Sequence, residues 1–222
     1  MINKPQIDVE RDNLLTDFGK EVLRDRYMLP TEKSPQEAFA RAAAAFADSD
    51  AHAKRLYDYS SKLWFMFATP ILSNGGTDRG LPISCFLNYV PDSREGLSEH
   101  YAENIWLSSS GGGIGGYWGD IRSQDQSTSK GNKTTGVIPF MHVVDSQMVA
   151  FNQGATRRGS YASYMDISHP EIIEFIEMRK PSGGDVNRKN LNLHHGINVS
   201  DKFMKALEKD ESWKLIDPHN KK

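Results

Sequence analysis

Four short segments stand out because each gathers residue types that donate hydrogen bonds to anions. In chain order they are Thr69–Asn74, Pro82–Cys85, Gly111–Gly116 and Gln153–Gly159. Small, hydroxyl-bearing and glycine residues dominate the first three segments, and arginines mark the fourth. Backbone amides, hydroxyls and guanidinium groups are the donors with which proteins hold phosphate. Together the four segments predict a site for a phosphate-bearing ligand.

The glycine-rich segment contains the pattern G-x-G-x-x-G at Gly111, Gly113 and Gly116. A dinucleotide-binding fingerprint needs a strand before this pattern and a helix after it. Here a helical pattern precedes it and a strand pattern follows at 117–122, so we reject that interpretation. A helix C-cap with a tight turn would account for one or two glycines. The surplus indicates that another backbone or a ligand approaches closely, and we favour a ligand.

Two further segments carry cationic groups that could reach an anion. The stretch Gly131–Thr134 lacks the glycine spacing of a phosphate loop, so we interpret it as part of a polar surface loop that carries Lys130 and Lys133. Arg157 and Arg158 directly follow a predicted helix. Taken alone, they fit best as solvated arginines near a helix C-terminus. The alternative is a pair of guanidinium groups that grips phosphates or a base edge.

Cys85 is the only cysteine of the chain. A lone cysteine in an apolar strand is usually a small buried residue, and Ser84 and the glycine-rich segments around it make that interpretation less one-sided here without overturning it. A single cysteine cannot form an internal disulfide, which fits a reducing compartment. There is no HExxH pattern and no cysteine pair, so we expect no bound metal.

The bulk composition is that of an ordinary globular protein. Of the 222 residues, 38% are hydrophobic and 25% are charged, and the formal net charge is -2. No stretch approaches the ~20 apolar residues that span a bilayer, and no charged-then-apolar leader is seen, so we expect a cytoplasmic protein without membrane contact. The near-neutral charge gives no electrostatic reason to bind nucleic acid.

Hydrophobic spacing predicts the elements that must position these segments. Helical periodicity covers about 14–29, 35–47 and 51–68, and Ser34 before Pro35 marks a helix start. From residue 83 onward, strands alternate with helices, which is typical of an α/β fold with parallel strands. The predicted strands are 83–90, 117–122, 161–167, 191–199 and 213–216, and the predicted helices are 93–109, 137–152, 168–180 and 201–209. We expect Asp92 to cap the helix 93–109 and the strand 83–90 to be buried. The expected inward stripe of the helix 93–109 consists of Leu97, Tyr101 and Ile105.

The order and content of these segments resemble the large (alpha) subunit of ribonucleotide reductase. The resemblance runs from about residue 14 to residue 220 and is strongest in five stretches: Thr69-Pro70, Ser84-Cys85, Gly112–Gly115, Thr135–Phe140 and Gln153–Gly159. Each stretch alone is weak evidence, whereas all of them in order are highly specific. The resemblance implies an α/β fold with an N-terminal helical region at 1–70. The first part of an incomplete ten-stranded α/β barrel, including the specificity-site helices and loops, would follow at 71–222.

The resemblance also implies the chemistry, which is thiyl-radical reduction of ribonucleotides to deoxyribonucleotides for DNA synthesis. Cys85 matches a barrel-strand cysteine that supplies one of the two reducing electrons. Thr69 and Ser84 would lie against the substrate diphosphate, with the backbone amides of Gly112 and Gly113 close by.

A second implied site binds an allosteric effector, a deoxynucleoside triphosphate or ATP, where two subunits meet. The residues implied to contact the effector are Asp92, Ser109, Arg122, Lys130 and Lys133. The segment 123–136 matches the first loop of that site, and 153–159 matches the second loop, which relays effector identity to the substrate base. The relay residues are Gln153, Arg157 and Arg158. The helices 93–109 and 138–152 would form the homodimer contact.

Two departures from the family limit what this chain is expected to do alone. The helical ATP-binding domain that controls overall activity has no room before Leu14, so we expect that control to be absent. The chain ends at Lys222, before the radical cysteine and the second reducing cysteine would appear, so we expect an inactive fragment that needs the remaining barrel portion. We expect no cofactor to bind this segment. The radical would come in trans from a metal-containing small subunit, with adenosylcobalamin as the alternative, and we favour diphosphates over triphosphates as substrates.

Two other classes of function compete with this interpretation. The chain could be a non-catalytic nucleotide-binding regulatory module that keeps the effector site without the chemistry. It could also be an unrelated α/β hydrolase or transferase, which we disfavour because there is no G-x-S-x-G motif, histidine-centred triad or phosphate loop.

Overall fold

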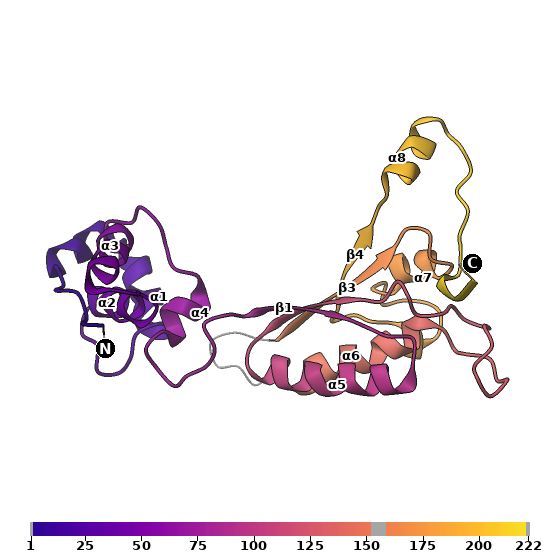
Figure 1. Cartoon of the computed structure of the whole chain (residues 1–222), viewed down its shortest axis with the longest axis horizontal. Coiled ribbons are helices and arrows are strands. Elements are labelled where there is room, and N and C mark those ends of the chain that lie inside the picture. The colour runs from indigo at the N-terminus through magenta and orange to yellow at the C-terminus, as the bar shows by residue number, and fades with distance from the viewer. Residues whose placement is uncertain (1, 152–158, 221–222) are drawn as a thin grey trace. The chain divides into compact units, whose positions relative to one another are not determined.

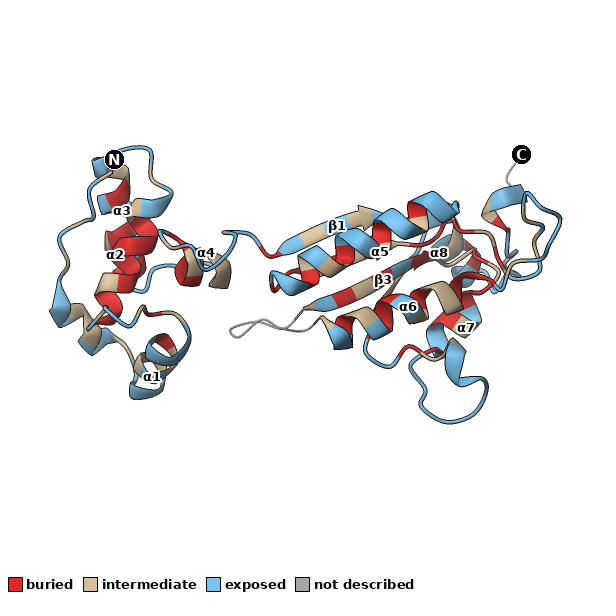
Figure 2. Ribbon diagram, turned by 90° about the horizontal axis from the view of Figure 1, so that it is seen from below, coloured by how far each residue is buried: buried red, intermediate tan, exposed pale blue. Residues whose placement is uncertain are grey.

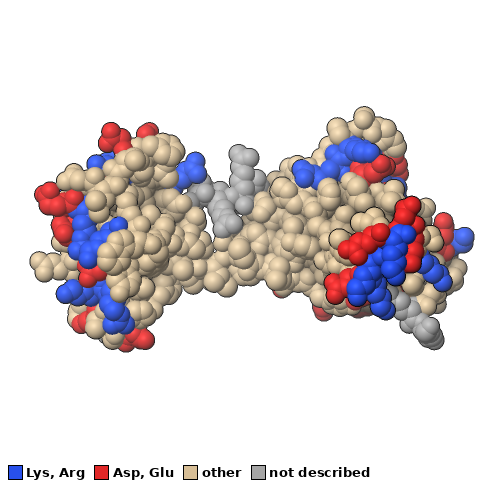
Figure 3. Space-filling view, turned by 90° about the horizontal axis from the view of Figure 1, so that it is seen from above, with Lys and Arg blue, Asp and Glu red and all other residues tan. Residues whose placement is uncertain are grey.

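The computed structural model describes residues 2–151 and 159–220, and the chain divides into two units, Met1–Ser84 and Cys85–Lys222 (Figure 1). The first unit is helical and the second is built on a parallel sheet, as the sequence predicts. Basic and acidic side chains are interspersed on both units in the view of Figure 3. This face therefore shows no broad field of one sign, and any anion bound there must be held by local groups.

The helical unit forms its core around one nearly buried helix. Its elements are η1 (Val9–Leu14), α1 (Asp17–Arg26), α2 (Pro35–Ala45), α3 (Asp50–Ser61) and α4 (Thr69–Asn74). Ser34 caps α2 as predicted, because its Oγ accepts a hydrogen bond from the amide of Gln36 at 3.1 Å. The alanine-rich α2 is buried along most of its length (Figure 2), and its Phe39 packs in one cluster with Tyr57 of α3 and Leu72 of α4.

A buried ion pair anchors α4, the helix that carries Thr69. Arg41 is 2% exposed, and its Nε lies 2.7 Å from Oε1 of Glu32. Its Nη1 donates to the carbonyl oxygens of Leu72 at 3.2 Å and Gly75 at 2.7 Å. The guanidinium group thus satisfies carbonyls at the end of α4 that have no partner within the helix. Thr69 is positioned by the core of its own unit.

The second unit is built on parallel strands in the order β1-β2-β3-β4. They are β1 (Cys85–Tyr89), β2 (Gly113–Tyr117), β3 (Ser160–Asp166) and β4 (His194–Asn198). The connections carry α5 (Arg94–Ser109), α6 (Val137–Ala150), α7 (Ile172–Glu177) and η2 (Val186–Arg188), and α8 (Asp201–Glu208) and η3 (Pro218–Asn220) follow β4. α5 and α6 lie side by side along one face of the sheet (Figures 1 and 2). This alternation of strand and helix is the predicted first part of an α/β barrel.

The core of this unit lies between the sheet and its helices. Tyr161 and Met165 of β3 pack against Met141 and Val144 of α6, and none of these side chains is more than 1% exposed. Because successive side chains of a strand point to opposite faces, the alternate residues face away from these helices. On that second face Leu87 is 87% exposed, so this side of β1 is open.

The first two glycines of the run form the C-terminal capping motif of α5. Gly111 has φ +74°, and the amides of Gly111 and Gly112 donate to the carbonyl oxygens of Ser108 and Leu107, both at 2.9 Å. This pair of bonds satisfies the last carbonyls of the helix and reverses the chain direction.

The predicted strand at 117–122 was wrong, because β2 begins earlier, at Gly113. Glycine has a low strand propensity. The sequence therefore favoured a strand at 117–122 over one in the glycine-rich segment before it. In the structure the missing side chain at Gly116 leaves the space that the ring of Tyr161 occupies. Packing between neighbouring strands overrides the propensity.

The fully buried stripe of α5 is polar, and the expected apolar stripe lies beside it, with two of its three residues packed against the core. Apart from Gly96, the buried residues of α5 are His100, Asn104 and Ser108. Nε2 of His100 lies 3.0 Å from the hydroxyl of Tyr161 and 2.9 Å from Nδ2 of Asn104. Leu97 and Tyr101 pack at the edge of the core, and Ile105 is intermediate in exposure. The helix is rotated by one position, and the side chains of His100 and Asn104 have hydrogen-bond partners in this orientation.

The segment 213–216 forms no strand, which corrects a second expectation. The amide of Ile216 donates to the carbonyl oxygen of Ser168 at 2.8 Å, and the ring of Trp213 packs edge-on against Phe203 of α8 with centroids 5.2 Å apart. The predicted helix 168–180 is also shorter, since the chain makes a turn at His169 before α7 begins at Ile172.

Candidate functional site

Cys85 lies at the amino end of β1 and is exposed. The expectation of a buried strand was wrong, because Cys85, Leu87 and Tyr89 all face the open side of the sheet and all are exposed. Cys85 is paired in register with Gly113 of β2, which is in turn paired with Ser160 of β3. A thiol on this face has small residues beside it and access from outside the sheet.

Close packing explains several of the glycines that the sequence assigned to a ligand. A Cβ on Gly112 would lie 2.7 Å from the carbonyl oxygen of Leu107 and 2.8 Å from Cε2 of Phe86. A Cβ on Gly115 would lie 2.7 Å from Cδ2 of Leu87. Such distances are too short for any other residue without movement of the neighbours. The glycine run therefore has a structural reason beside the predicted contact with a ligand.

The other two predicted substrate residues belong to the helical unit. Thr69 is the first residue of α4, and its Oγ1 lies 3.3 Å from the hydroxyl of Tyr27. Ser84 is 9% exposed and is the last residue of that unit, directly before Cys85. Gly112 and Gly113 belong to the second unit, where Gly113 is the register partner of Cys85.

Asp92 and Arg122, two predicted effector residues, contact each other beyond the carboxyl ends of β1 and β2. Nε of Arg122 lies 2.7 Å from Oδ2 of Asp92, and both side chains are partly exposed. Nη1 of Arg122 donates to the carbonyl oxygen of Ser127 at 2.6 Å, inside the loop 123–136. One guanidinium group thus connects the acidic residue to the loop. The arrangement places a carboxylate beside a cation. A carboxylate can accept a hydrogen bond from a ribose hydroxyl, and a guanidinium group can pair with a phosphate.

The cap of α5 differs from the prediction. Ser93, not Asp92, is the N-cap, and its Oγ accepts a hydrogen bond from the amide of Gly96 at 2.9 Å. The carboxylate of Asp92 is therefore not used by the helix and is engaged by Arg122 instead.

The loop 123–136 is a narrow hairpin-like loop that carries its two lysines near the turn. Ser127 and Lys133 form an antiparallel bridge, and Gly131 turns the chain with φ +76°. Lys130 and Lys133 are both exposed, and Nζ of Lys133 lies 3.9 Å from Oδ1 of Asp125, which is also exposed. An exposed pair at this distance is weak, so both ammonium groups are accessible to an anion.

Ser109 lies at the other end of α5 from Asp92. It is exposed, and its Oγ donates to the carbonyl oxygen of Ile105 at 2.7 Å. At a rise of 1.5 Å per residue, the helix places it roughly 24 Å from Asp92 along the helix axis. Within one chain, therefore, the structure brings Asp92 and Arg122 together but not Ser109.

The relay residues Gln153, Arg157 and Arg158 lie outside the described residues. The described chain resumes at Gly159 and enters β3 at Ser160, which is the register partner of Gly113. This end of β3 is on the same edge of the sheet as Cys85.

Two tyrosines stand on the open face at the carboxyl edge. The rings of Tyr89 and Tyr117 are stacked with centroids 6.2 Å apart, and the hydroxyl of Tyr117 donates to Oδ2 of Asp166 at 2.8 Å. Burial, and next the hydrogen bond with Asp166, raise the pKa of Tyr117. Burial, and next the charge of Asp120, raise the pKa of Tyr89. Both phenols therefore remain protonated hydrogen-bond donors beside the Asp92–Arg122 pair.

Sequence reasoning missed two buried carboxylates that hold the loop 123–136, those of Glu171 and Asp217. Each is 7% exposed. Burial raises the pKa of Glu171, although hydrogen bonds from the backbone oppose the shift. Burial also opposes ionisation of Asp217, but hydrogen bonds from Ser123 outweigh it and lower the pKa of that carboxyl. Their partners at the two ends of the loop, Ser123, Gln124 and Val137, lie 34 to 94 residues away in the chain, so no local pattern could have revealed these contacts.

The described part of the chain holds no group of three or more histidine, cysteine, aspartate or glutamate residues arranged to bind a metal ion. Within the same residues, no helix has the length and apolar character needed to cross a bilayer.

Two sequence families match the chain in succession. Residues 13–80 match the family described as the ribonucleotide reductase all-alpha domain, and residues 83–222 match the ribonucleotide reductase barrel domain. The two matches meet close to the division between the helical and the sheet-containing unit.

Individual relatives cover three quarters or more of the chain. A putative ribonucleoside-diphosphate reductase large subunit of Frog virus 3 is 55% identical over 166 residues, which are 75% of this chain and 28% of the relative. The ribonucleoside-diphosphate reductase large subunit of Invertebrate iridescent virus 6 is 45% identical over 223 residues, which are 97% of this chain and 22% of the relative. A solved structure, the class Id ribonucleotide reductase alpha subunit of Actinobacillus ureae, superposes with a TM-score of 0.72 at 26% identity, covering 93% of this chain and 37% of that one. The chain thus spans about a quarter of the length of these two viral relatives.

Proposed function

The chain belongs to the ribonucleotide reductase large-subunit family, and on that premise we propose that it forms the N-terminal part of a ribonucleoside-diphosphate reductase alpha subunit. The proposed reaction converts ribonucleoside diphosphates to deoxyribonucleoside diphosphates for DNA synthesis. The observation that carries the proposal is the position of Cys85, exposed on the open face of β1 in register with Gly113.

Cys85 is proposed to be one of the two thiols that reduce the substrate. The 2′-hydroxyl leaves as water, and the two thiols are oxidised to a disulfide. The chain has one cysteine, so the second thiol must come from the remaining barrel portion. The hydroxyls of Thr69 and Ser84 and the amide of Gly113 are proposed to contact the substrate diphosphate. The amide of Gly112 already donates to the carbonyl oxygen of Leu107 at 2.9 Å, so the structure does not support it as a phosphate ligand. A radical-generating small subunit supplies the radical in trans, and this segment binds no cofactor of its own.

A deoxynucleoside triphosphate or ATP is the proposed effector at the carboxyl edge of the sheet. Asp92 would accept a hydrogen bond from the ribose, Arg122 would pair with phosphate, and Lys130 and Lys133 would close over the triphosphate. The support is that Asp92, Arg122 and the loop 123–136 are already connected by hydrogen bonds. This site lies at the opposite edge of the sheet from Cys85, at the other end of the five-residue strand β1.

The proposed effector site is completed by a second copy of the chain. A two-fold axis perpendicular to α5 would turn the partner's helix end for end, and Ser109 of the partner subunit would then approach Asp92. Exposed apolar side chains support a contact through α5 and α6, since Trp106 is 76% exposed and Val149 is 61% exposed. We propose a cytoplasmic homodimer on this basis.

A regulatory nucleotide-binding module is the second candidate. It is favoured by one observation, namely that Asp92, Arg122 and the loop lie within one unit of this chain and need no second thiol. Such a module would bind nucleotide but would never be required for reduction.

The test compares wild type with Cys85→Ser in the complete large subunit that contains this chain. With a radical-generating subunit and a dithiol reductant, we expect wild type to form deoxycytidine diphosphate from cytidine diphosphate and Cys85→Ser to form none above background. Ser160→Ala, in the neighbouring strand position, is the matched control and should retain turnover. Full activity of Cys85→Ser would contradict the catalytic role and favour the regulatory module.

A further inference from the structure

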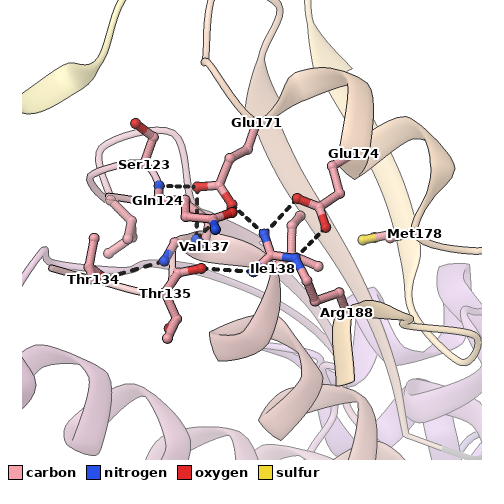
Figure 4. A network of polar contacts seen from close by, with 12 residues as sticks. Ser123, Gln124, Thr134, Thr135, Val137, Ile138, Glu171, Glu174, Met178 and Arg188 are labelled. Carbon is pink, nitrogen blue, oxygen red and sulfur yellow. Dashed lines mark hydrogen bonds and ion pairs between the residues drawn. The ribbon is translucent and has the colours of Figure 1, made fainter. Parts of the chain in front are cut away.

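Both ends of the loop 123–136 are held by the same buried carboxylate. Glu171 accepts a hydrogen bond from the amide of Gln124 at 3.1 Å, at the start of the loop (Figure 4). It also accepts from the amide of Val137, with Oε2 at 3.0 Å and Oε1 at 3.2 Å, where the loop ends and α6 begins. One side chain from outside the loop therefore fixes the separation of its two stems.

The start of α6 depends on this carboxylate. Its N-cap is Gly136, at φ +87°, and no side chain of the helix itself caps it. The first amides of a helix need an acceptor, and a negative charge is favourable at that end. Glu171 supplies both. A Cβ on Gly136 would lie 2.4 Å from Oε1 of Glu171, so the glycine allows the carboxylate to come this close.

Arg188 holds Glu171 in place and touches the loop as well. Its Nη2 lies 3.1 Å from Oε1 of Glu171, and its Nη1 donates to the carbonyl oxygen of Thr135 at 2.8 Å. The same guanidinium group makes a two-pronged contact with Glu174, through Nε and through Nη2, the latter at 2.6 Å. The carboxylate of Glu171 is thus neutralised and oriented by a side chain that also binds the second stem.

The residue next to Arg122 is fixed by a further carboxylate. Oδ2 of Asp217 accepts hydrogen bonds from the amide of Ser123 at 2.7 Å and from its Oγ at 2.5 Å. The backbone on the C-terminal side of Arg122 is therefore held at two successive amides, those of Ser123 and Gln124.

Glu171 does not act by touching the nucleotide. A hollow of about 560 Å³ adjoins it, but the acidic groups of Asp125, Glu171, Glu174 and Glu177 line that hollow. Among the described residues that line this hollow there is no lysine or arginine, so it does not suit a triphosphate. Arg122, Lys130 and Lys133 are the cations proposed to hold the phosphates.

We propose that Glu171, oriented by Arg188, is a positioning residue that preorganises the loop 123–136 for the effector. The inference rests on the proposed function of that loop. Binding costs less when a loop is already held in its bound conformation, so loss of the acceptor raises the dissociation constant of the nucleotide. Because coupling is reciprocal, bound nucleotide in turn slows exchange of the amides that Glu171 accepts from.

The experiment uses the complete large subunit that contains this chain and measures dTTP binding by calorimetry, well below the thermal transition. Glu171→Gln keeps the shape but loses the charge and one acceptor oxygen, and we expect the Kd for dTTP to rise about tenfold. Glu177→Gln is the matched control, because Glu177 is the last residue of α7, the helix that Glu171 directly precedes, lines the same hollow and forms an ion pair with Lys180 at 2.6 Å. Its Kd should equal that of wild type.

Hydrogen exchange separates positioning from a purely structural role. In wild type, dTTP should protect the amides of Gln124 and Val137, and in Glu171→Gln this nucleotide-dependent protection should be lost. A structural role alone would lower the unfolding temperature and leave Kd and protection in the folded subunit unchanged, which would overturn the proposal. If Glu171→Gln fails to fold, Arg188→Lys, which keeps the charge but not the two-pronged geometry, must raise Kd; wild-type affinity in that variant would also overturn it. Absence of dTTP binding to wild type would instead refute the effector site itself.

Discussion

The hydroxyl of Tyr161 lies so close to Gly116 on the neighbouring strand that a Cβ at that position would fall 1.6 Å from it. The hydroxyl is held there, because Nε1 of Trp118 donates to it at 3.0 Å and Nε2 of His100 lies 3.0 Å away. It cannot move aside without breaking a buried hydrogen-bonded group.

We therefore expect Gly116→Ala to destabilise the chain by about 3 kcal/mol or more, as overpacking of a rigid core does. Urea unfolding of wild type and variant measures the effect. Gly131→Ala is the control, since nothing lies within 4 Å of its added methyl group and only its φ of +76° is unfavourable. That change should cost about 1 kcal/mol. Equal losses in the two variants would contradict the packing role of Gly116.

His100 makes stability depend on pH. Burial lowers the pKa of His100 to about 4, against 6.5 in an unfolded chain. As the pH falls from 6.5 towards 4, the unfolded chain takes up a proton that the folded chain does not, so stability is present above pH 6.5 and is lost in this window. We expect a loss of about 2 kcal/mol between pH 7 and pH 5. The same pair of urea titrations on His100→Gln should show a much smaller loss, and an undiminished loss there would assign the effect to other groups.

Exposure of Cys85 predicts that its thiol reacts in the folded chain. Iodoacetamide at pH 8 should modify one thiol per chain in native buffer, at a rate close to that in urea, because Cys85 is exposed on the open face of β1. Mass spectrometry follows the reaction. Modification that appears only after denaturation would show that Cys85 is buried and would remove the basis for its role.

The pairing of Asp92 with Arg122 predicts how the effector site responds to substitution. Asp92→Ala removes a charged hydrogen-bond acceptor and should cost about 1.5–3 kcal/mol of dTTP affinity. Arg157→Ala, in the relay segment, should leave that affinity nearly intact and alter which substrate base is chosen. Calorimetry and product analysis on the complete subunit distinguish the two. A large loss of dTTP affinity in Arg157→Ala would mean that the relay segment binds the effector directly.

Local signals in the sequence were sufficient where the structure is decided locally. Ser34 and Pro35 mark the start of α2, and the predicted helix 201–209 agrees with α8. The alternation of strands and helices indicated the parallel sheet, and the ordered motifs indicated the family. The helix starts depend on residues a few positions apart, and the order of the motifs can be read along the chain without knowing any contact between them.

Signals failed where a distant side chain decides the outcome. The strand at Gly113 depends on Tyr161, the polar stripe of α5 depends on partners in β3, and the stems of the loop depend on Glu171. Residue propensities and hydrophobic periodicity cannot predict such contacts, since the partners are tens of residues away in the chain. The same limit applied to the effector residues, because Ser109 matches the family motif yet lies at the far end of α5 from Asp92.

The central claim is that the two edges of one sheet hold two separate functions, a reducing thiol at Cys85 and an effector site at Asp92. The most direct test measures deoxynucleotide formation by the complete subunit with its radical source, with and without dTTP, in Cys85→Ser and Asp92→Ala. We predict that Cys85→Ser forms no product but binds dTTP as wild type does, whereas Asp92→Ala still forms product and no longer responds to dTTP. If Cys85→Ser retains turnover, or if Asp92→Ala responds to dTTP as wild type does, the account is contradicted.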